Sequence, residues 1–272
     1  MVPTGSPADH RSIASTDIGP LTTASPVRTV AVTPFANTMT ARTLLRISIA
    51  AGLFSVAACS SDSLTGPGTR SALTVEPPAR NPVLFVHGWN SSGAIWFTMM
   101  DRFIADGYRA DELYNWTYYS AQSNAVTAQQ LGTKVNEILA ATGASKVDIV
   151  THSMGALSAR YYIKNLGGGT TVDEFVSLAG PNHGTNTAYF CGQAACVEMR
   201  PNSSFLNALN KKDETPGRVI RYGTWWSACD EVINPQRSTI LNGATNVQTA
   251  CMGHSALYSD ATVYGMVKAW VQ

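Results

Sequence analysis

The sequence predicts a three-layer α/β domain in residues 81–272, with a minimal, mostly parallel central sheet and helices on both faces. Two observations carry this prediction. Short apolar runs alternate with segments of helical period along this part of the chain, which is typical of parallel strands joined by crossover helices. The runs at residues 83–86 and 147–150 are mostly apolar, as expected for strands that are buried on both faces.

Helices and further strands follow these two runs in order. An apolar stripe at helical spacing joins the two strands and ends near Gly143. A second helix is predicted after Ser153, up to Leu166, because this segment contains no glycine or proline beyond Gly155. Residues 175–179 and 219–224 predict two more strands, and residues 259–272 predict a closing amphipathic helix. The stripe of the first helix consists of Leu131, Val135, Ile138 and Leu139.

The composition fits one globular domain with additional sequence at one end. The chain has 272 residues, of which 44% are hydrophobic and 14% are charged. Its net charge is +1, from 19 basic and 18 acidic residues, so charge favours neither nucleic acid nor another polyanion as a partner. We expect a monomer that does not bind nucleic acid.

Residues 1–80 are rich in Ser, Thr, Ala and Pro, and we exclude them from the fold. Arg42 and Arg46 precede an apolar run at residues 47–58, which is followed by Cys59. This order of basic, apolar and small residues is typical of an export signal. A run of 12 residues is too short to span a hydrocarbon core of ~30 Å as a helix, so a cleaved signal is favoured over a permanent anchor.

The tetrapeptide Val-Ala-Ala-Cys that ends at Cys59 resembles the bacterial lipobox, in which the cysteine is acylated and becomes the new N-terminus. We therefore expect residues 39–58 to be a lipoprotein-type signal peptide and residues 59–80 to be a flexible tether. Met39 has the features of a natural start. If translation begins there rather than at Met1, residues 1–38 are a non-native or disordered extension. The alternative is an ordinary signal peptide with an incidental cysteine. In both cases we expect export, as an envelope lipoprotein that contacts the membrane by its lipid anchor only or as a secreted protein.

Four cysteines follow the export signal, and an even number in an oxidising compartment indicates two disulfides. Three pairings are possible. We favour Cys191 with Cys196, which closes a short loop, and Cys229 with Cys251, which joins two segments that the site prediction places side by side. A zinc site is disfavoured, because only one pair of cysteines is closely spaced. No metal or cofactor is expected.

The segment Thr-His-Ser-Met-Gly around Ser153 lies between a predicted strand and a predicted helix. A nucleophile elbow occupies this position, because the sharp turn there exposes the serine hydroxyl above the sheet. Such a turn needs small residues two positions before and after the serine, which Gly155 satisfies and the β-branched Thr151 does not. The alternative is that Ser153 is only the N-cap of the helix.

A nucleophilic serine needs a histidine base and an acid that orients it, in the chain order serine, acid, histidine for this kind of fold. Only His183 and His254 follow Ser153, and His254 has the expected place in a turn before the last helix. Asp230 follows the strand predicted at residues 219–224 and is our candidate acid. The rival acids Asp213 and Glu214 lie in a polar, lysine-rich loop.

Acyl transfer also needs two backbone N–H groups that stabilise the oxyanion of the tetrahedral intermediate. One is expected from Met154, directly after the nucleophile, and the other from Trp89, in the loop after the first strand. The alternatives are that His87 and Gly88 only shape this turn and that Trp89 is an exposed aromatic contact for lipid.

At this point the chain resembles the small bacterial secreted lipases of the α/β-hydrolase superfamily, which are grouped as class 2 lipases. The blocks that carry the resemblance are residues 81–88, 146–155 and 161–166, together with Asn246-Val247 and Gly253-His254. It implies a compact six-stranded parallel core without a large lid, metal-independent ester hydrolysis and the site roles given above. The family usually has alanine at the place of Thr151.

The sequence therefore predicts a serine hydrolase that cleaves carboxylic esters through an acyl-enzyme, as a triacylglycerol lipase or carboxylesterase. A segment longer than that of the smallest relatives contains Cys191 and Cys196 and is expected to border the acyl pocket. A polyester hydrolase or an acyltransferase with the same triad is the alternative among enzymes. A non-catalytic surface lipoprotein that uses the scaffold for binding is the alternative from another class.

Overall fold

The computed structural model of this chain describes residues 78–271. The predicted signal peptide, the lipidation candidate Cys59 and nearly all of the predicted tether therefore lie outside the described residues. Within residues 78–271, no helix is both long and apolar enough to cross a lipid bilayer.

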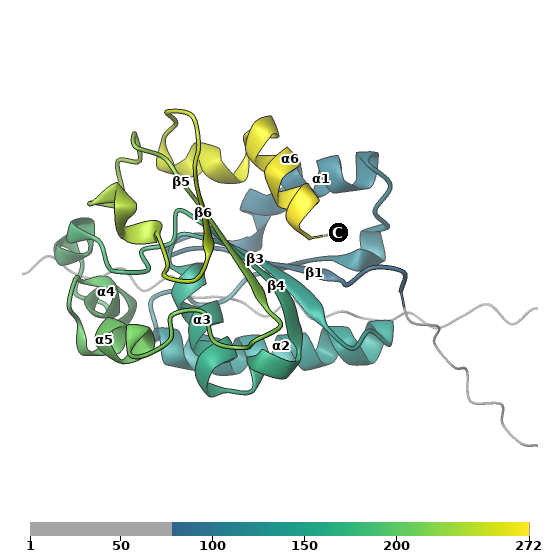
Figure 1. Cartoon of the computed structure of the whole chain (residues 1–272), viewed down its shortest axis with the longest axis horizontal. Coiled ribbons are helices and arrows are strands. Elements are labelled where there is room, and N and C mark those ends of the chain that lie inside the picture. The colour runs from purple at the N-terminus through teal and green to yellow at the C-terminus, as the bar shows by residue number, and fades with distance from the viewer. Residues whose placement is uncertain (1–77, 272) are drawn as a thin grey trace, which may run out of the picture. The chain divides into compact units, whose positions relative to one another are not determined.

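Six strands form one sheet in the order β2-β1-β3-β4-β5-β6 (Figure 1). Every neighbouring pair is parallel, so the predicted α/β class is confirmed and this sheet is parallel throughout. The strands are β1 (Val83–Val86), β2 (Leu113–Trp116), β3 (Val147–His152), β4 (Val172–Leu178), β5 (Arg221–Trp226) and β6 (Thr245–Gln248).

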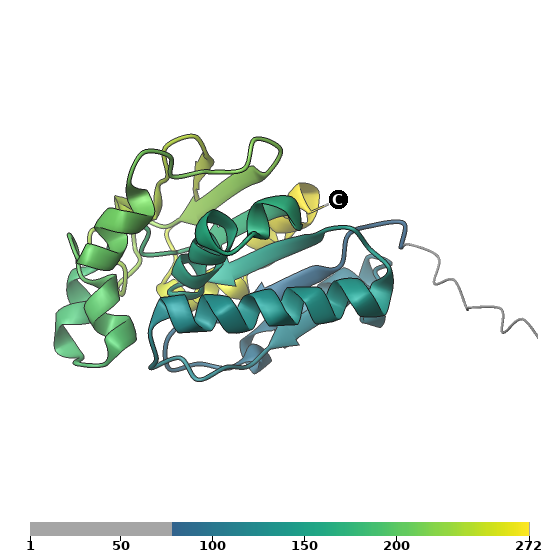
Figure 2. The same ribbon diagram turned by 90° about the horizontal axis from the view of Figure 1, so that it is seen from below.

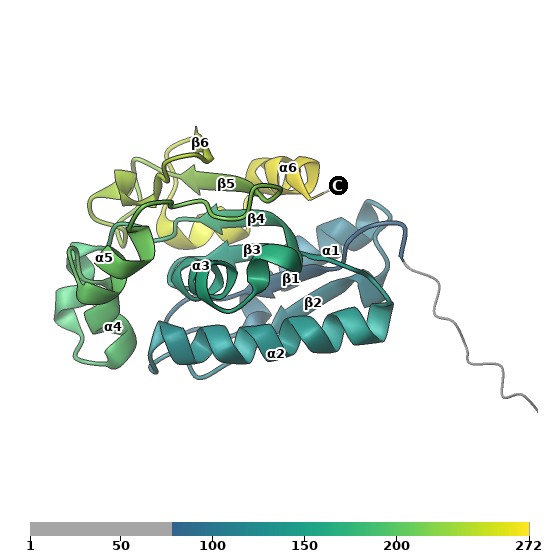
Figure 3. The same ribbon diagram turned by 60° about the horizontal axis from the view of Figure 1, so that its bottom comes forward.

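Helices cover both faces of the sheet. The helices α2 and α3 pack on one face and α1 and α6 on the other (Figure 3). Figure 2 shows the longest of them, α2, extended along the sheet. The helices are α1 (Phe97–Ala105), α2 (Asn124–Thr142), α3 (Gly155–Asn165), α4 (Ala194–Met199), α5 (Ser204–Asn210) and α6 (Ala261–Trp270).

Strand β1 shows why both faces are covered. Its four residues are fully buried. Leu84 and Val86 belong to the core beneath α2 and α3, whereas Val83 and Phe85 belong to the core beneath α1 and α6. Because successive side chains of a strand point to opposite faces, an uninterrupted apolar run requires two apolar layers around it.

The predicted crossover helix is α2. The side chain of Ser123 accepts a hydrogen bond from the Ala125 N–H at its start. Its end is set by Gly143, which adopts the left-handed conformation at φ 71° that glycine reaches without steric cost. The predicted stripe residues Leu131, Val135 and Ile138 are buried against the sheet.

Three predicted starts are wrong. Strand β4 begins at Val172, three residues before the predicted 175, and the starts of two later elements were predicted two residues too early. Strand β5 begins at Arg221 rather than at residue 219, because Gly217 is left-handed and the Ile220 N–H closes a turn onto its carbonyl at 2.9 Å. The last helix begins at Ala261 rather than at residue 259, because the carboxylate of Asp260 caps it and accepts the first free N–H groups.

Candidate active site

Ser153 lies in the turn between β3 and α3, as the sequence predicts. Its φ is 55°, in the left-handed region that a residue with a side chain enters at a cost of ~1–3 kcal/mol. The turn is held in place by the Ser153 N–H, which donates to the Leu178 carbonyl of β4 at 2.9 Å. This strand, strained turn and helix form the geometry of a nucleophile elbow.

Glycine is required at two positions around the elbow. A Cβ atom on Gly155 would lie 2.5 Å from the His87 carbonyl oxygen and 2.8 Å from that of Val86. A Cβ atom on Gly88 would lie 2.8 Å from the Ser153 Cβ. The loop after β1 therefore packs directly on the nucleophile turn.

The structure also accounts for Thr151, which departs from the small residue expected there. Thr151 is fully buried in β3, and its Oγ1 donates to the Val176 carbonyl of β4 at 2.7 Å. Because its hydroxyl has a partner, the buried threonine carries no unpaired polar group.

His254 and Asp230 form a buried pair. The His254 Nδ1 lies 2.9 Å from the Asp230 Oδ2. The other carboxylate oxygen of Asp230 accepts the N–H groups of Val232 at 2.8 Å and Ile233 at 2.9 Å. An aspartate held in this way fixes the Nδ1–H tautomer of its histidine and leaves Nε2 available as a base.

Further contacts tie the loop of the acid to the loop of the base. The disulfide Cys229–Cys251 links the two loops. The Ser227 hydroxyl oxygen accepts the N–H groups of Cys229 at 3.1 Å and of Met252 at 2.9 Å. The Glu231 carboxylate accepts the His254 N–H at 3.0 Å. Sequence reasoning missed the roles of Ser227 and Glu231, although Glu231 directly follows the candidate acid.

Ser153 and His254 line the same cavity, which has a volume of about 370 Å³. None of the described residues that line it is an Asp, Glu, Lys or Arg. Both the predicted oxyanion loop and the long segment after β4 contribute to its wall. Its lining includes Gly88, Trp89, Thr185, Ala188, Cys191, Cys196, Met199, Val232, Ile233 and Tyr258.

The segment at residues 186–200 contributes several residues to the cavity wall. It contains a short 3-10 helix (Asn186–Phe190), the disulfide Cys191–Cys196 and α4. The Trp89 indole N–H donates to the Gln193 side chain at 2.6 Å, so this segment contacts the loop after β1. Phe190 is 94% exposed and Tyr189 is 58% exposed, between the lining residues Ala188 and Cys191.

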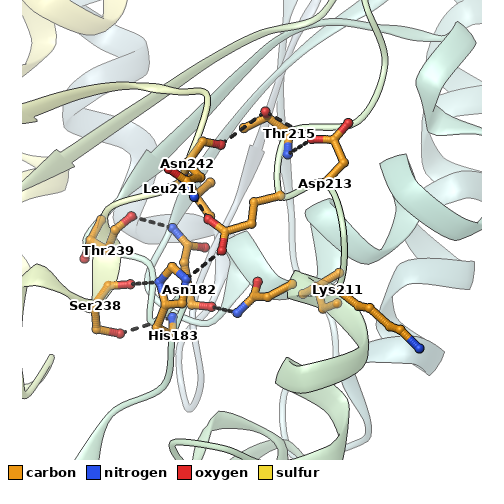
Figure 4. Close-up of polar contacts among 12 residues, drawn as sticks. Asn182, His183, Lys211, Asp213, Thr215, Ser238, Thr239, Leu241 and Asn242 are labelled. Carbon is orange, nitrogen blue, oxygen red and sulfur yellow. Dashed lines mark hydrogen bonds and ion pairs between the residues drawn. The ribbon is translucent and has the colours of Figure 1, made fainter.

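His183, the other histidine after Ser153, lies in a separate polar network (Figure 4). It is not among the residues that line the cavity. Its Nε2 pairs with the Glu214 carboxylate at 3.0 Å, and its backbone N–H donates to the Ser238 carbonyl at 3.0 Å. Asp213, the other rival acid, accepts the Thr215 N–H at 2.9 Å. Glu214 thus engages His183 rather than His254.

Within residues 78–271, no three His, Cys, Asp or Glu side chains are grouped in a way that would hold a metal ion.

Comparisons with known proteins identify the family and the fold of this chain. Residues 80–268 match the family described as Lipase (class 2). The fold is similar to that of the mature lipase BlEst2 of Bacillus licheniformis, with a TM-score of 0.63 and 18% identity over 72% of this chain and 95% of that one.

Two other solved structures share the fold at lower similarity. Lipase B of Aspergillus fumigatus has a TM-score of 0.59 and 15% identity over 71% of this chain and 54% of that one. Phospholipase PlaB of Legionella pneumophila has a TM-score of 0.56 and 14% identity over 72% of this chain and 60% of that one. At these identities the likeness concerns the fold alone.

Proposed function

The chain belongs to the class 2 lipase family of ester hydrolases, and we propose that it cleaves lipid esters through an acyl-enzyme on Ser153. One observation carries this proposal. His254, whose Nδ1 lies 2.9 Å from the buried Asp230 Oδ2, lines the same cavity as Ser153, which lies on a strained strand-to-helix turn.

The chemistry follows from the roles of these three residues. His254 Nε2 takes the proton of the Ser153 hydroxyl as the oxygen attacks the ester carbonyl, and it then gives that proton to the leaving alcohol. Water activated by the same nitrogen attacks the acyl-enzyme and releases the carboxylic acid. Asp230 keeps His254 in the required tautomer and stabilises the imidazolium that forms in each step.

The oxyanion is stabilised by the backbone N–H groups of Met154 and Trp89. Met154 is the N-cap of α3, where N–H groups have no partner within the helix and the helix dipole favours negative charge. Trp89 lines the cavity and directly follows Gly88, which packs on Ser153. Losing one such donor typically lowers the rate by ~10²–10³.

An uncharged, largely apolar acyl group is the substrate part that fits best. Burial of a charged acyl chain against a wall without Lys, Arg, Asp or Glu would leave its charge unpaired. The exposed aromatic side chains Tyr189 and Phe190, which follow the lining residue Ala188 in the chain, favour contact with a lipid surface. Both features support a triacylglycerol lipase or carboxylesterase.

The two disulfides support an exported protein, because such bonds persist in oxidising compartments. We retain lipid anchoring at Cys59, cleavage before it and a monomeric state as parts of the proposal. Mass spectrometry of the mature protein from a bacterial host tests the anchor, because an unmodified Cys59 would contradict it.

The first experiment measures hydrolysis of p-nitrophenyl esters from short to long acyl chains by the wild-type chain and by Ser153→Ala. Ser145→Ala is the matched control, because Ser145 is exposed and is not part of the cavity wall. We expect the wild type and the control to hydrolyse the esters and Ser153→Ala to be inactive.

The substrate class is decided by the chain-length profile and the products. Turnover of long-chain esters and triacylglycerol supports a lipase, and an optimum at short chains supports a carboxylesterase. Release of monomers from polyester film that is faster than hydrolysis of these esters supports a polyester hydrolase. Transfer of the acyl group to an added alcohol supports an acyltransferase. A wild type inactive on all esters, or full activity of Ser153→Ala, would favour the non-catalytic binding protein.

A further inference from the structure

His87, directly after β1, is fully buried and has a hydrogen-bond partner at each ring nitrogen. Its Nε2 lies 3.3 Å from the backbone nitrogen of Tyr118, and its Nδ1 lies 2.7 Å from the carbonyl oxygen of Gly88. A backbone N–H can only donate and a carbonyl oxygen can only accept. These partners therefore fix one neutral tautomer, in which Nε2 accepts and Nδ1–H donates.

The His87 ring is held in place by Tyr118. The two rings stack with centroids 4.1 Å apart and an interplanar angle of 16°. The Tyr118 hydroxyl also donates to the His87 carbonyl oxygen at 2.5 Å. Burial lowers the pKa of His87, which keeps the ring neutral and so preserves the accepting nitrogen. The Nδ1–H group that points at Gly88 is therefore held in place by Tyr118, through its ring, its hydroxyl and its backbone N–H.

The Gly88 carbonyl oxygen, which accepts the hydrogen bond from His87 Nδ1, belongs to the peptide that links Gly88 to Trp89. A trans peptide is planar, and its C=O and N–H groups point in opposite directions. Holding the Gly88 carbonyl against His87 therefore directs the Trp89 N–H away from the His87 ring. The same peptide lies beside the nucleophile, because a Cβ on Gly88 would be 3.2 Å from the Ser153 Oγ.

Because residue 88 is a glycine, the orientation of the peptide that follows it must be fixed by contacts with other residues. Its close approach to Ser153 excludes a side chain, and without one the backbone has little conformational preference of its own. Nothing intrinsic to Gly88 would keep the following peptide in one orientation.

We propose that His87 is a positioning residue, which holds the Gly88–Trp89 peptide so that the Trp89 N–H stays aimed at the oxyanion. This inference rests on the proposed function, because it assigns a role within that reaction. The alternative is that His87 only shapes the turn. The two roles can be told apart, because an oxyanion donor stabilises the transition state more than the bound substrate, so that its misplacement lowers kcat more than it changes KM.

Two variants separate the hydrogen bonds of the ring. In His87→Asn, the side-chain amide reaches the place of Nδ1 and can still donate to the Gly88 carbonyl. In His87→Gln, the longer side chain reaches the place of Nε2 and can accept from Tyr118 but no longer donates to Gly88. Both variants lose one hydrogen bond and the stacked ring, so each serves as the other's control for stability.

The assay uses a soluble ester, p-nitrophenyl butyrate, below the melting temperature of the less stable variant. We expect His87→Gln to lower kcat by about 10- to 100-fold with KM changed less than about 2-fold. We expect His87→Asn to retain kcat within about 3-fold. An alkyl boronic acid, which forms a tetrahedral adduct with the serine, should bind His87→Gln more weakly by a similar factor.

Two results would overturn the inference. One is an equal loss of kcat in both variants, and the other is wild-type kcat in His87→Gln. If either variant does not fold, long-range ¹⁵N–¹H spectra of the wild-type protein can still test the inference by identifying the tautomer of His87. The inference requires that Nδ1 is protonated and that Nε2 is not. A proton on Nε2 would overturn it.

Failure of the proposed function gives a different pattern. In that case the wild type neither hydrolyses the ester nor becomes labelled at Ser153 by an alkyl phosphonate. An active wild type with an unaffected His87→Gln variant contradicts only the positioning role.

Discussion

His152 Nε2 lies 3.1 Å from the carbonyl oxygen of His254, and the centroids of the two imidazole rings are 4.4 Å apart. The carbonyl accepts, so Nε2 of His152 carries a proton and donates. Burial lowers the pKa of His152 well below its ordinary value, and the neighbouring His254 adds to this effect. A neutral histidine next to the nucleophile therefore holds the backbone of the proposed base.

Removing this contact should slow catalysis with little effect on substrate binding. His152→Phe keeps an aromatic ring but leaves the buried His254 carbonyl without its donor, which costs ~1–3 kcal/mol and loosens the base. We expect kcat to fall about 10-fold with KM nearly unchanged, measured on p-nitrophenyl butyrate. His183→Phe is the control, because His183 lies outside the cavity. Equal effects of the two substitutions would argue against a specific role of His152.

Asp230→Asn should remove most of the activity without a large structural change. The amide can keep an oxygen on the N–H groups of Val232 and Ile233, but it then presents an NH₂ group to His254 Nδ1 and favours the wrong tautomer. We expect kcat to fall on the order of 10⁴-fold.

The rival acid Asp213 provides the comparison for this substitution. Asp213→Asn should keep wild-type kcat, because this carboxylate accepts from Thr215 in another network. If Asp213→Asn were the inactive variant, the assignment of the acid would be wrong.

The sequence predicted the centre of the sheet better than its edges. The apolar runs of β1 and β3 are buried on both faces, and this burial makes their pattern distinctive. The edge strands β2 and β6, with sequences LYNW and TNVQ, are more polar and partly exposed, so no apolar run indicates them. Helix α1 was not predicted either, although its buried residues Met99 and Phe103 are spaced four apart, as on one face of a helix.

The candidate site shows the same limit. Ser153 and His254 have local signals, since one lies in a strand-to-helix motif and the other in a turn before the last helix. Tyr118 is 31 residues from His87, and nothing in its own segment indicates the stacked contact. Supporting residues of this kind depend on which strands are neighbours, and β2, whose end leads to Tyr118, is one of the strands that the sequence did not reveal.

The elbow should not tolerate even one added methyl group at its glycine. In Gly155→Ala, the new Cβ would lie 2.5 Å from the His87 carbonyl, and backbone atoms on both sides would have to move. We expect kcat/KM to fall more than about 100-fold, because a displacement near 1 Å is enough for such a loss. Far-UV circular dichroism would establish that the variant still folds.

Gly265→Ala is the matched substitution in α6. Nothing lies within 4 Å of its added Cβ, so this variant should gain roughly 0.5–1 kcal/mol of stability and keep full activity. A Gly155→Ala variant as active as Gly265→Ala would contradict the close packing of the elbow.

Asp148, near the start of the inner strand β3, should make the protein less stable as the pH rises. Burial raises the pKa of its carboxyl from 3.8 to about 7, against the opposing effect of the Asn81 hydrogen bond. Between pH 4 and 7 the folded chain therefore binds more protons at this site than the unfolded chain. The free energy of unfolding then falls with rising pH across this window, by at most about 1.4 kcal/mol per unit, and levels off above pH 7.

Asp148→Asn tests this effect because its amide is neutral at every pH and keeps an oxygen for the Asn81 amide and the Glu174 N–H. Its melting temperature should match that of the wild type at pH 5, where the aspartate is protonated, and exceed it at pH 8. The exposed Asp101→Asn removes the same charge from the surface and should show no such divergence.

Buried His87 and His152 lower stability below pH 6.5 in all three proteins, because their pKa values are lowered in the folded state. Only differences in melting temperature between the proteins are therefore compared. If Asp148→Asn were less stable than the wild type at pH 8, the carboxylate would be stabilising in its charged form and the sign of this prediction would be wrong.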